Sequence, residues 1–137
     1  MGYEILNHTA DFGVRLFGNT LEELFKSGFL AIIDAMVEIK GQPGKVHEFT
    51  YENEAETLED LLVDFLSEII FQTIVYSRIF VNCEISVQGK SLKAKLFYEN
   101  FDPTRHRLKK EIKSVTYHNL HIIKTESGYE ATVICDV

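Results

Sequence analysis

Two stretches of the chain repeat apolar residues at the spacing of an amphipathic helix. Each stretch follows a threonine with acidic residues two and three positions later, Thr20-Leu21-Glu22-Glu23 and Thr57-Leu58-Glu59-Asp60, which is typical of a helix start. The first pattern predicts a helix that ends before Gly41-Gln42-Pro43-Gly44. The second predicts a helix over about Leu58 to Tyr76, largely buried against a sheet because Ile70, Phe71 and Ile74 widen its apolar face.

From Arg78 onward the period of the pattern changes to two, which indicates strands. Ile79, Val81, Cys83, Ile85 and Val87 are expected to share one face, and a Gly89-Lys90 turn leads into a second strand through Leu96. A later hairpin is predicted from Leu120 to Asp136, with further strands over 3–6, 14–17 and 46–51. We therefore expect an α+β fold, with two helices packed on a mixed, mainly antiparallel sheet in a single-domain sandwich spanning 1–137.

The composition is that of an ordinary globular protein, with 137 residues, 45% hydrophobic residues and a net charge of −7. This charge disfavours a protein whose whole surface binds nucleic acid. Cys83 and Cys135 lie in apolar runs without metal-binding spacing, so no disulfide is expected. No secretory signal is apparent, and acidic residues interrupt the apolar run from Leu58 to Val75, so we expect a cytoplasmic protein with no membrane span.

Candidate chemistry lies near the two ends of the sequence. Asn7-His8-Thr9-Ala10-Asp11-Phe12-Gly13 interrupts the opening strands and is predicted to form a shaped turn, either for a ligand or only for its own backbone. If the last strand lies beside the opening one, Asp11, Asp136 and the Val137 α-carboxylate converge. Three anionic groups favour a hard divalent cation such as Ca²⁺ or Mg²⁺. His8 is a candidate to add a nitrogen ligand, although a histidine beside a turn more often holds another ligand by a hydrogen bond or is only structural.

A basic cluster contrasts with the acidic chain. It consists of Arg105, Arg107, Lys109, Lys110 and Lys113, against one acidic neighbour, Glu111. The cluster is interpreted either as a contact for RNA, nucleotide phosphate or an acidic protein surface, or as a solvated loop and strand edge. No interleaved aromatic platform in the sequence favours the RNA contact.

Motifs along the whole chain resemble the archease family. They are Asn7-His8-Thr9-Ala10-Asp11-Phe12-Gly13-Val14, Thr20-Leu21-Glu22-Glu23-Leu24, the 59–66 helix segment, Phe101-Asp102-Pro103-Thr104-Arg105-His106, the 111–118 run and Cys135-Asp136-Val137. Phe12 and Asn119 depart from the residues usual in the family, which concerns loop detail only.

The resemblance implies an accessory protein of the tRNA-splicing ligase, which joins RNA ends bearing a 3′-phosphate or cyclic phosphate to a 5′-hydroxyl. Such a protein promotes guanylylation and turnover of the ligase and is not itself the catalyst. The resemblance also implies a divalent metal site, here at Asp11, Asp136 and Val137. Lys113 and His118 match the family's Lys-Ser/Ala-Val-Thr-Tyr-His run and are further candidate functional residues.

Two other functions are compatible with parts of the sequence. The same carboxylates could serve a small metal-dependent phosphohydrolase, although no activated serine or phosphate-binding glycine loop accompanies them. A general RNA-binding or chaperone module is the third hypothesis, and the acidic charge disfavours it.

Overall fold

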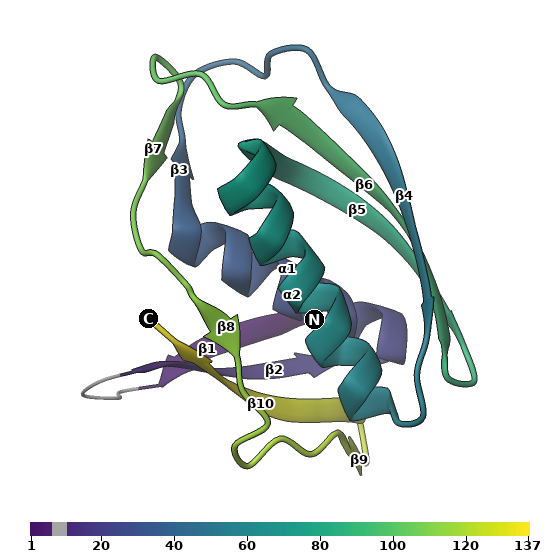
Figure 1. Ribbon diagram of the computed structural model, residues 1–137. Coiled ribbons are helices and arrows are strands. Elements are labelled where there is room, and N and C mark those ends of the chain that lie inside the picture. Colours follow the sequence, from purple (N-terminus) through teal and green to yellow (C-terminus); the bar gives the residue numbers. More distant parts are fainter. Residues whose placement is uncertain (7–10) are drawn as a thin grey trace.

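The computed structural model describes residues 1–6 and 11–137 as two helices enclosed by antiparallel strands (Figure 1). Helix α1 spans Leu21–Met36 and α2 spans Leu58–Tyr76. The strands are β1 Gly2–Leu6, β2 Asp11–Gly18, β3 Val37–Ile39, β4 His47–Glu54, β5 Arg78–Gln88, β6 Ser91–Asn100, β7 His106–Leu108, β8 Ser114–Val115, β9 Ile123–Thr125 and β10 Gly128–Asp136. The α+β class is confirmed.

The strands of the described residues divide into three sheets. The first has the order β1-β2-β10-β8, with β9 also paired to β10, so β10 is a central strand. The second joins β3 to β7, and the third has the order β4-β6-β5. In Figure 1 the first sheet lies below the helices and the third lies to their right. The helices therefore fill the angle between two sheets and bury an apolar face against each.

Both helices start where the sequence predicts, because threonine caps them. The Thr20 hydroxyl accepts a hydrogen bond from the Glu23 amide at 3.1 Å, and Thr57 accepts one from the Asp60 amide at 3.0 Å. Helix α1 ends earlier than predicted. Val37 leaves the helical conformation and begins β3, which pairs with β7. Residues 37–39 are thus a strand rather than the last turn of the helix.

The core contains several aromatic rings from both helices and the third sheet. The rings of Phe25 and Phe65 lie 6.2 Å apart between the helices, and Phe29 packs against Phe80 of β5 at 6.4 Å. Gly28 lets α1 approach α2, since a Cβ atom there would lie 3.1 Å from a Leu66 methyl. Aromatic packing and close helix contact together fix the two helices relative to the sheets.

Strand β5 differs from the strict alternation that the sequence predicts. A bulge in its pairing with β6, between Phe80 and Asn82, places Ile79 and Phe80 both in the core. Val81 is consequently 36% exposed, whereas Cys83 is buried again. The extra residue in the bulge shifts the buried face by one position, which an alternating pattern cannot anticipate.

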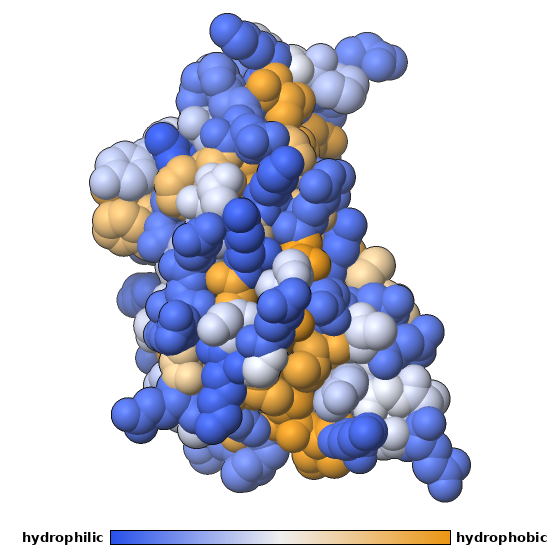
Figure 2. All heavy atoms as spheres, turned by 90° about the vertical axis from the view of Figure 1, so that its right-hand side faces the viewer, coloured by the Kyte–Doolittle hydropathy of each residue, from blue (hydrophilic) through white to orange (hydrophobic). Residues whose placement is uncertain are grey.

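The outer face of the third sheet is strongly charged, with contacts such as Lys93 Nζ to Glu52 at 3.6 Å. Figure 2 views the molecule from this side, where hydrophilic side chains cover most of the surface, the largest hydrophobic patch lies in the lower half, and a smaller one lies near the top. Among residues 1–6 and 11–137, no helix is long and apolar enough to cross a bilayer.

Candidate functional site

Asp11 and Asp136 lie directly opposite each other in the pairing of β2 with β10. Their neighbours Phe12 and Cys135 form the next pair and are buried, whereas both aspartates are exposed. Directly opposed residues of an antiparallel pair project from the same face of the sheet, with Cβ atoms about 5 Å apart. The fold therefore brings these two candidate residues together, although 125 positions of sequence separate them by number.

The surroundings of Asp136 are polar. The Ser114 hydroxyl donates to Asp136 Oδ2 at 3.2 Å, and the Lys113 amide donates to the Asp136 carbonyl oxygen at 2.8 Å. Within the described part of the chain, neither Asp11 nor Asp136 forms an ion pair with a basic residue. Two neighbouring carboxylates without a basic partner repel each other, and a bound cation would offset that repulsion.

The donor chemistry of this pair fits a hard divalent cation, because both side chains offer carboxylate oxygens. Val137 follows Asp136 directly and is 39% exposed. No group of three His, Cys, Asp or Glu side chains able to hold a metal ion occurs in residues 1–6 and 11–137. Asp11 and Asp136 are therefore the two described side chains that could serve as ligands here.

The predicted turn at 7–13 is described only in part. Asp11, Phe12 and Gly13 belong to β2 and pair with β10, so they are strand residues and not part of a turn. This corrects the prediction, because Phe12 and Val14 alternate toward the core as a strand requires. Asn7, His8, Thr9 and Ala10 lie outside the described residues, and the prediction for His8 stays a prediction.

Lys113 and His118 occupy different positions relative to the aspartate pair. The backbone of Lys113 is hydrogen-bonded to Asp136, so its exposed side chain starts next to the pair. His118 lies in the turn after β8, where its amide donates to the Thr116 hydroxyl at 3.3 Å. Among the hydrogen bonds and ion pairs of the described chain, none joins His118 to Asp136. The fold thus brings the backbone of Lys113 to Asp136, whereas the described contacts of His118 lie within its own turn, at Thr116 and Asn119.

A groove beside Asp11 was not apparent in the sequence. Its volume is about 760 Å³, and its lining includes Tyr3, Asp11, Asp34, Lys109 and Lys110. The Tyr3 hydroxyl donates to Asp34 Oδ2 at 2.5 Å. Burial, and then this hydrogen bond, raise the pKa of Tyr3 to about 12, so the phenol keeps its proton into the alkaline range, where a free tyrosine would lose it. The groove places two lysines and two aspartates on one surface, contributed by β2, α1 and the loop after β7.

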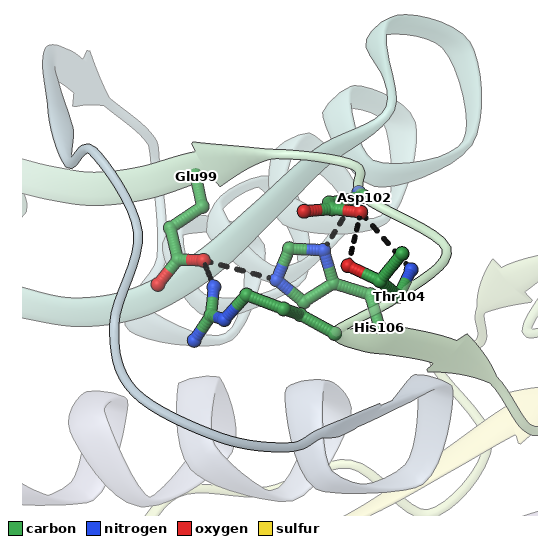
Figure 3. Close-up of polar contacts among 5 residues, drawn as sticks. Glu99, Asp102, Thr104 and His106 are labelled. Atoms are coloured by element: carbon green, nitrogen blue, oxygen red, sulfur yellow. Dashed lines mark hydrogen bonds and ion pairs between the residues drawn. The ribbon is translucent and has the colours of Figure 1, made fainter.

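Arg105 departs from the basic cluster proposed from the sequence. It forms an ion pair with Glu99, a buried carboxylate near the end of β6, while Arg107 pairs with Glu38 at 2.5 Å (Figure 3 shows the Glu99 contacts). Two of the five basic residues therefore have carboxylate partners. Lys109, Lys110 and Lys113 form no ion pair among the described residues.

His106 completes this buried cluster. Its Nδ1 accepts from the Asp102 amide at 2.9 Å, so the proton resides on Nε2, which lies 3.1 Å from Glu99 Oε1. The Thr104 amide and hydroxyl donate to Asp102 and lower the pKa of its carboxyl. Figure 3 shows these contacts closing the loop between β6 and β7. Because Glu99 and His106 are buried, we interpret the cluster as one that stabilises the fold and not as a binding site.

Comparison with known proteins identifies the family. Residues 3–137 match the sequence pattern of the Archease protein family. This chain belongs to that family. It is 35% identical over 140 residues to protein archease of Pyrococcus furiosus, covering 98% of each chain. It is 39% identical over 131 residues to protein archease of Thermococcus kodakarensis, covering 92% of this chain and 91% of that one.

Solved structures of family members have the same fold. The solution structure of Methanobacterium thermoautotrophicum protein 1598 gives a TM-score of 0.70 at 26% identity, with 99% of both chains covered. A Thermotoga maritima crystal structure described as "an archease, possible chaperone" gives 0.66 at 23% identity, covering 96% of this chain and 94% of that one. The second comparison supports the fold alone. Membership in the archease family supports a role as an accessory protein.

Proposed function

We propose that this family member is a metal-binding accessory protein that activates the GTP-dependent tRNA-splicing ligase and is not itself an enzyme. The observation that carries the proposal is the pairing of Asp11 with Asp136, which creates an exposed carboxylate pair on one face of the first sheet. Family membership supports the accessory role. The ligase as partner, and guanylylation as the step promoted, follow from the resemblance of the sequence motifs.

In this proposal Asp11, Asp136 and the Val137 carboxylate hold a divalent ion, Ca²⁺ or Mg²⁺. A bound divalent ion supplies positive charge that can orient phosphate oxygens. The Lys113 amide donates to the Asp136 carbonyl oxygen at 2.8 Å, and in this proposal the Lys113 ammonium group adds a positive charge that binds phosphate oxygens near the ion. The chain itself contributes binding and orientation, and the nucleotide transfer belongs to the ligase.

Calorimetric titration with Ca²⁺ and with Mg²⁺ tests the ion site. Asp136→Asn should weaken binding at least about tenfold, because it removes a charged ligand. Glu130→Gln is the matched control, since Glu130 is another acidic residue of β10, and its binding should stay within about twofold of the native value. Adding one glycine after Val137 should also weaken binding, because it moves the terminal carboxylate. Unchanged affinity in Asp136→Asn contradicts the site.

Although Asp136→Asn should weaken metal binding, it should stabilise the folded protein when no metal is present. Removing one of two opposed carboxylates should raise the free energy of unfolding by about 0.5 kcal/mol in chelator. Calcium should raise the melting temperature of the native protein but not that of the variant. A variant that is simply misfolded would lose stability in both conditions, so urea unfolding separates the two explanations.

The accessory role is tested with ligase, GTP and a divalent metal, by measuring guanylylated ligase with and without this chain. We expect faster guanylylation with the native protein, at least about tenfold less stimulation with Asp136→Asn, and native stimulation with Glu130→Gln. No change in guanylylated ligase would contradict the role. Phosphoester hydrolysis by the isolated chain, lost in Asp11→Asn, would instead favour the phosphohydrolase.

A further inference from the structure

An apolar groove lies at the C-terminal end of α2, on the surface next to β7. Its volume is about 380 Å³, and its lining includes Met36, Ile74, Ile79, Phe101, Leu108 and Lys109. Leu108 is 62% exposed and Ile74 49%, so the apolar lining is accessible from solvent. The space could hold one large apolar side chain of a partner.

The exposed apolar surface continues from the groove along α2. Sequence periodicity predicted that Phe71 and Ile74 would be buried, yet they are 48% and 49% exposed, and the last residues, Val75 and Tyr76, are exposed as well. The prediction was wrong here because the third sheet and α1 cover only part of the helix. Apolar residues grouped on a surface helix favour an interaction site over chance exposure.

Backbone hydrogen bonds hold the walls of the groove. The Phe101 amide donates to the Ser77 carbonyl oxygen at 3.0 Å, which fixes the loop after β6 to the end of α2. The Lys109 amide donates to the Met36 carbonyl oxygen at 2.8 Å, which fixes the opposite wall to the end of α1. The groove is therefore preformed, and binding there would not have to order its walls.

The rim of the groove is basic. Lys109 and Lys110 line it with Glu111, and neither lysine forms an ion pair in the described part of the chain. Arg107, by contrast, is paired with Glu38. Unpaired ammonium groups beside an apolar floor complement an apolar side chain flanked by carboxylates.

We propose that this groove binds an acidic segment of a partner protein through one large apolar side chain, with neighbouring carboxylates facing Lys109 and Lys110. The inference rests on the proposed accessory role, since that role requires a partner protein, but it does not depend on the metal. The two lysines also line the groove beside Asp11. A segment bound here would hold its protein next to the aspartate pair.

Peptide selection tests the groove without any ligase. Random 12-residue peptides displayed on phage are selected on the native protein, and the enriched peptides are synthesised and measured by fluorescence anisotropy. We expect peptides with an aromatic or large aliphatic residue next to Asp or Glu. Leu108→Glu should weaken their binding at least about tenfold, and Lys109→Glu/Lys110→Glu should do the same at low salt.

Two matched variants serve as controls. Ile123→Glu changes another exposed apolar residue, 54% exposed on β9, and Lys93→Glu/Lys95→Glu reverses two charges on β6. Binding to both should stay within about twofold of native. Melting temperatures of all variants verify that they fold. If Leu108→Glu does not fold, Leu108→Ala replaces it and carries the same expectation of weaker binding.

Three results would overturn the proposal. One is that no peptide is enriched over selection on the Leu108→Glu variant. Another is enrichment of basic peptides or of peptides that bind the variant equally well. The third is a dimer in sedimentation experiments that Leu108→Glu dissociates, since the groove would then be occupied by a second copy of this chain. None of these results depends on guanylylation, so they are distinguishable from failure of the proposed function.

Discussion

At the scale of single residues, burial decides what Cys83 and Cys135 can do. Both thiols are buried, and burial raises the pKa of each to about 12. Glu84 adds to this rise for Cys83 while Lys26 opposes it, and Asp136 adds to it for Cys135. Thiols with such pKa values remain protonated at neutral pH and are poor nucleophiles.

We therefore expect neither cysteine to react with a disulfide reagent such as DTNB at pH 8 while the protein is folded, and both to react in denaturant. The free energy of unfolding should be unaffected by these thiols below about pH 8.5, where they are protonated in both states. It should fall as the pH rises toward 12, because only the unfolded chain then gains thiolates. Urea unfolding at pH 7 and pH 10 measures this, and Cys83→Ala/Cys135→Ala should show a weaker alkaline loss. Rapid labelling of the folded protein would contradict the prediction.

The sequence predicted the aspartate pair because Asp11 and Asp136 stand at the ends of apolar, strand-like runs near the two ends of the chain. The role of Arg105 could not be predicted in this way. Its charge grouped it with neighbouring lysines, yet its partner Glu99 becomes available only after β6 is formed and covered. A charge pattern along the chain carries no information about carboxylates brought close by folding.

At the scale of elements, capping and periodicity predicted both helices and both hairpins. The shorter strands β3, β7 and β8 were not predicted, because segments of two or three residues contain too few positions for a period. The β5 bulge and the exposed apolar end of α2 also depend on tertiary contacts. The sequence therefore predicted the long elements better than the surfaces they leave uncovered.

Glycines at two hairpins, Gly89 in its turn and Gly128 directly after its turn, provide an element-scale prediction. Gly128 has φ +149°, and a Cβ atom there would meet the backbone of Gly18 and Asn19, 2.7 Å from Asn19 Cα. Gly89 also has positive φ, at +61°, but a Cβ atom there has nothing within 4 Å. Gly128→Ala should lower the free energy of unfolding by about 3 kcal/mol and Gly89→Ala by only about 1 kcal/mol, measured by urea unfolding. Equal losses would contradict a steric role for Gly128.

At the scale of the whole molecule, the Glu99 cluster connects parts of the fold that share no strand pairing. Glu99 belongs to the third sheet, whereas His106 begins β7 of the second sheet. Gly44, in the segment between β3 and β4, passes close to both Glu99 and Arg105. Three separate segments therefore meet at one buried carboxylate, and the sequence gives no indication of this meeting.

Glu99→Ala should lower the free energy of unfolding by about 3 kcal/mol, because the half-buried Arg105 and the buried His106 would lose their shared partner. Glu52→Ala is the control, since Glu52 and Lys93 form an exposed pair, and it should cost less than about 0.5 kcal/mol. Urea unfolding measures both. Similar losses in the two variants would show that the buried cluster adds nothing beyond an ordinary surface pair.

The central place of β10 in the first sheet has a consequence for biosynthesis. Strand β2 ends at Gly18 and its neighbour β10 begins at Gly128, so about 110 residues must be translated between the two partners. At usual bacterial or eukaryotic elongation rates this takes roughly 5 to 20 s. During that interval the edge of β2 that later pairs with β10 is unpaired, and a chaperone or fast downstream translation would lower its risk of aggregating.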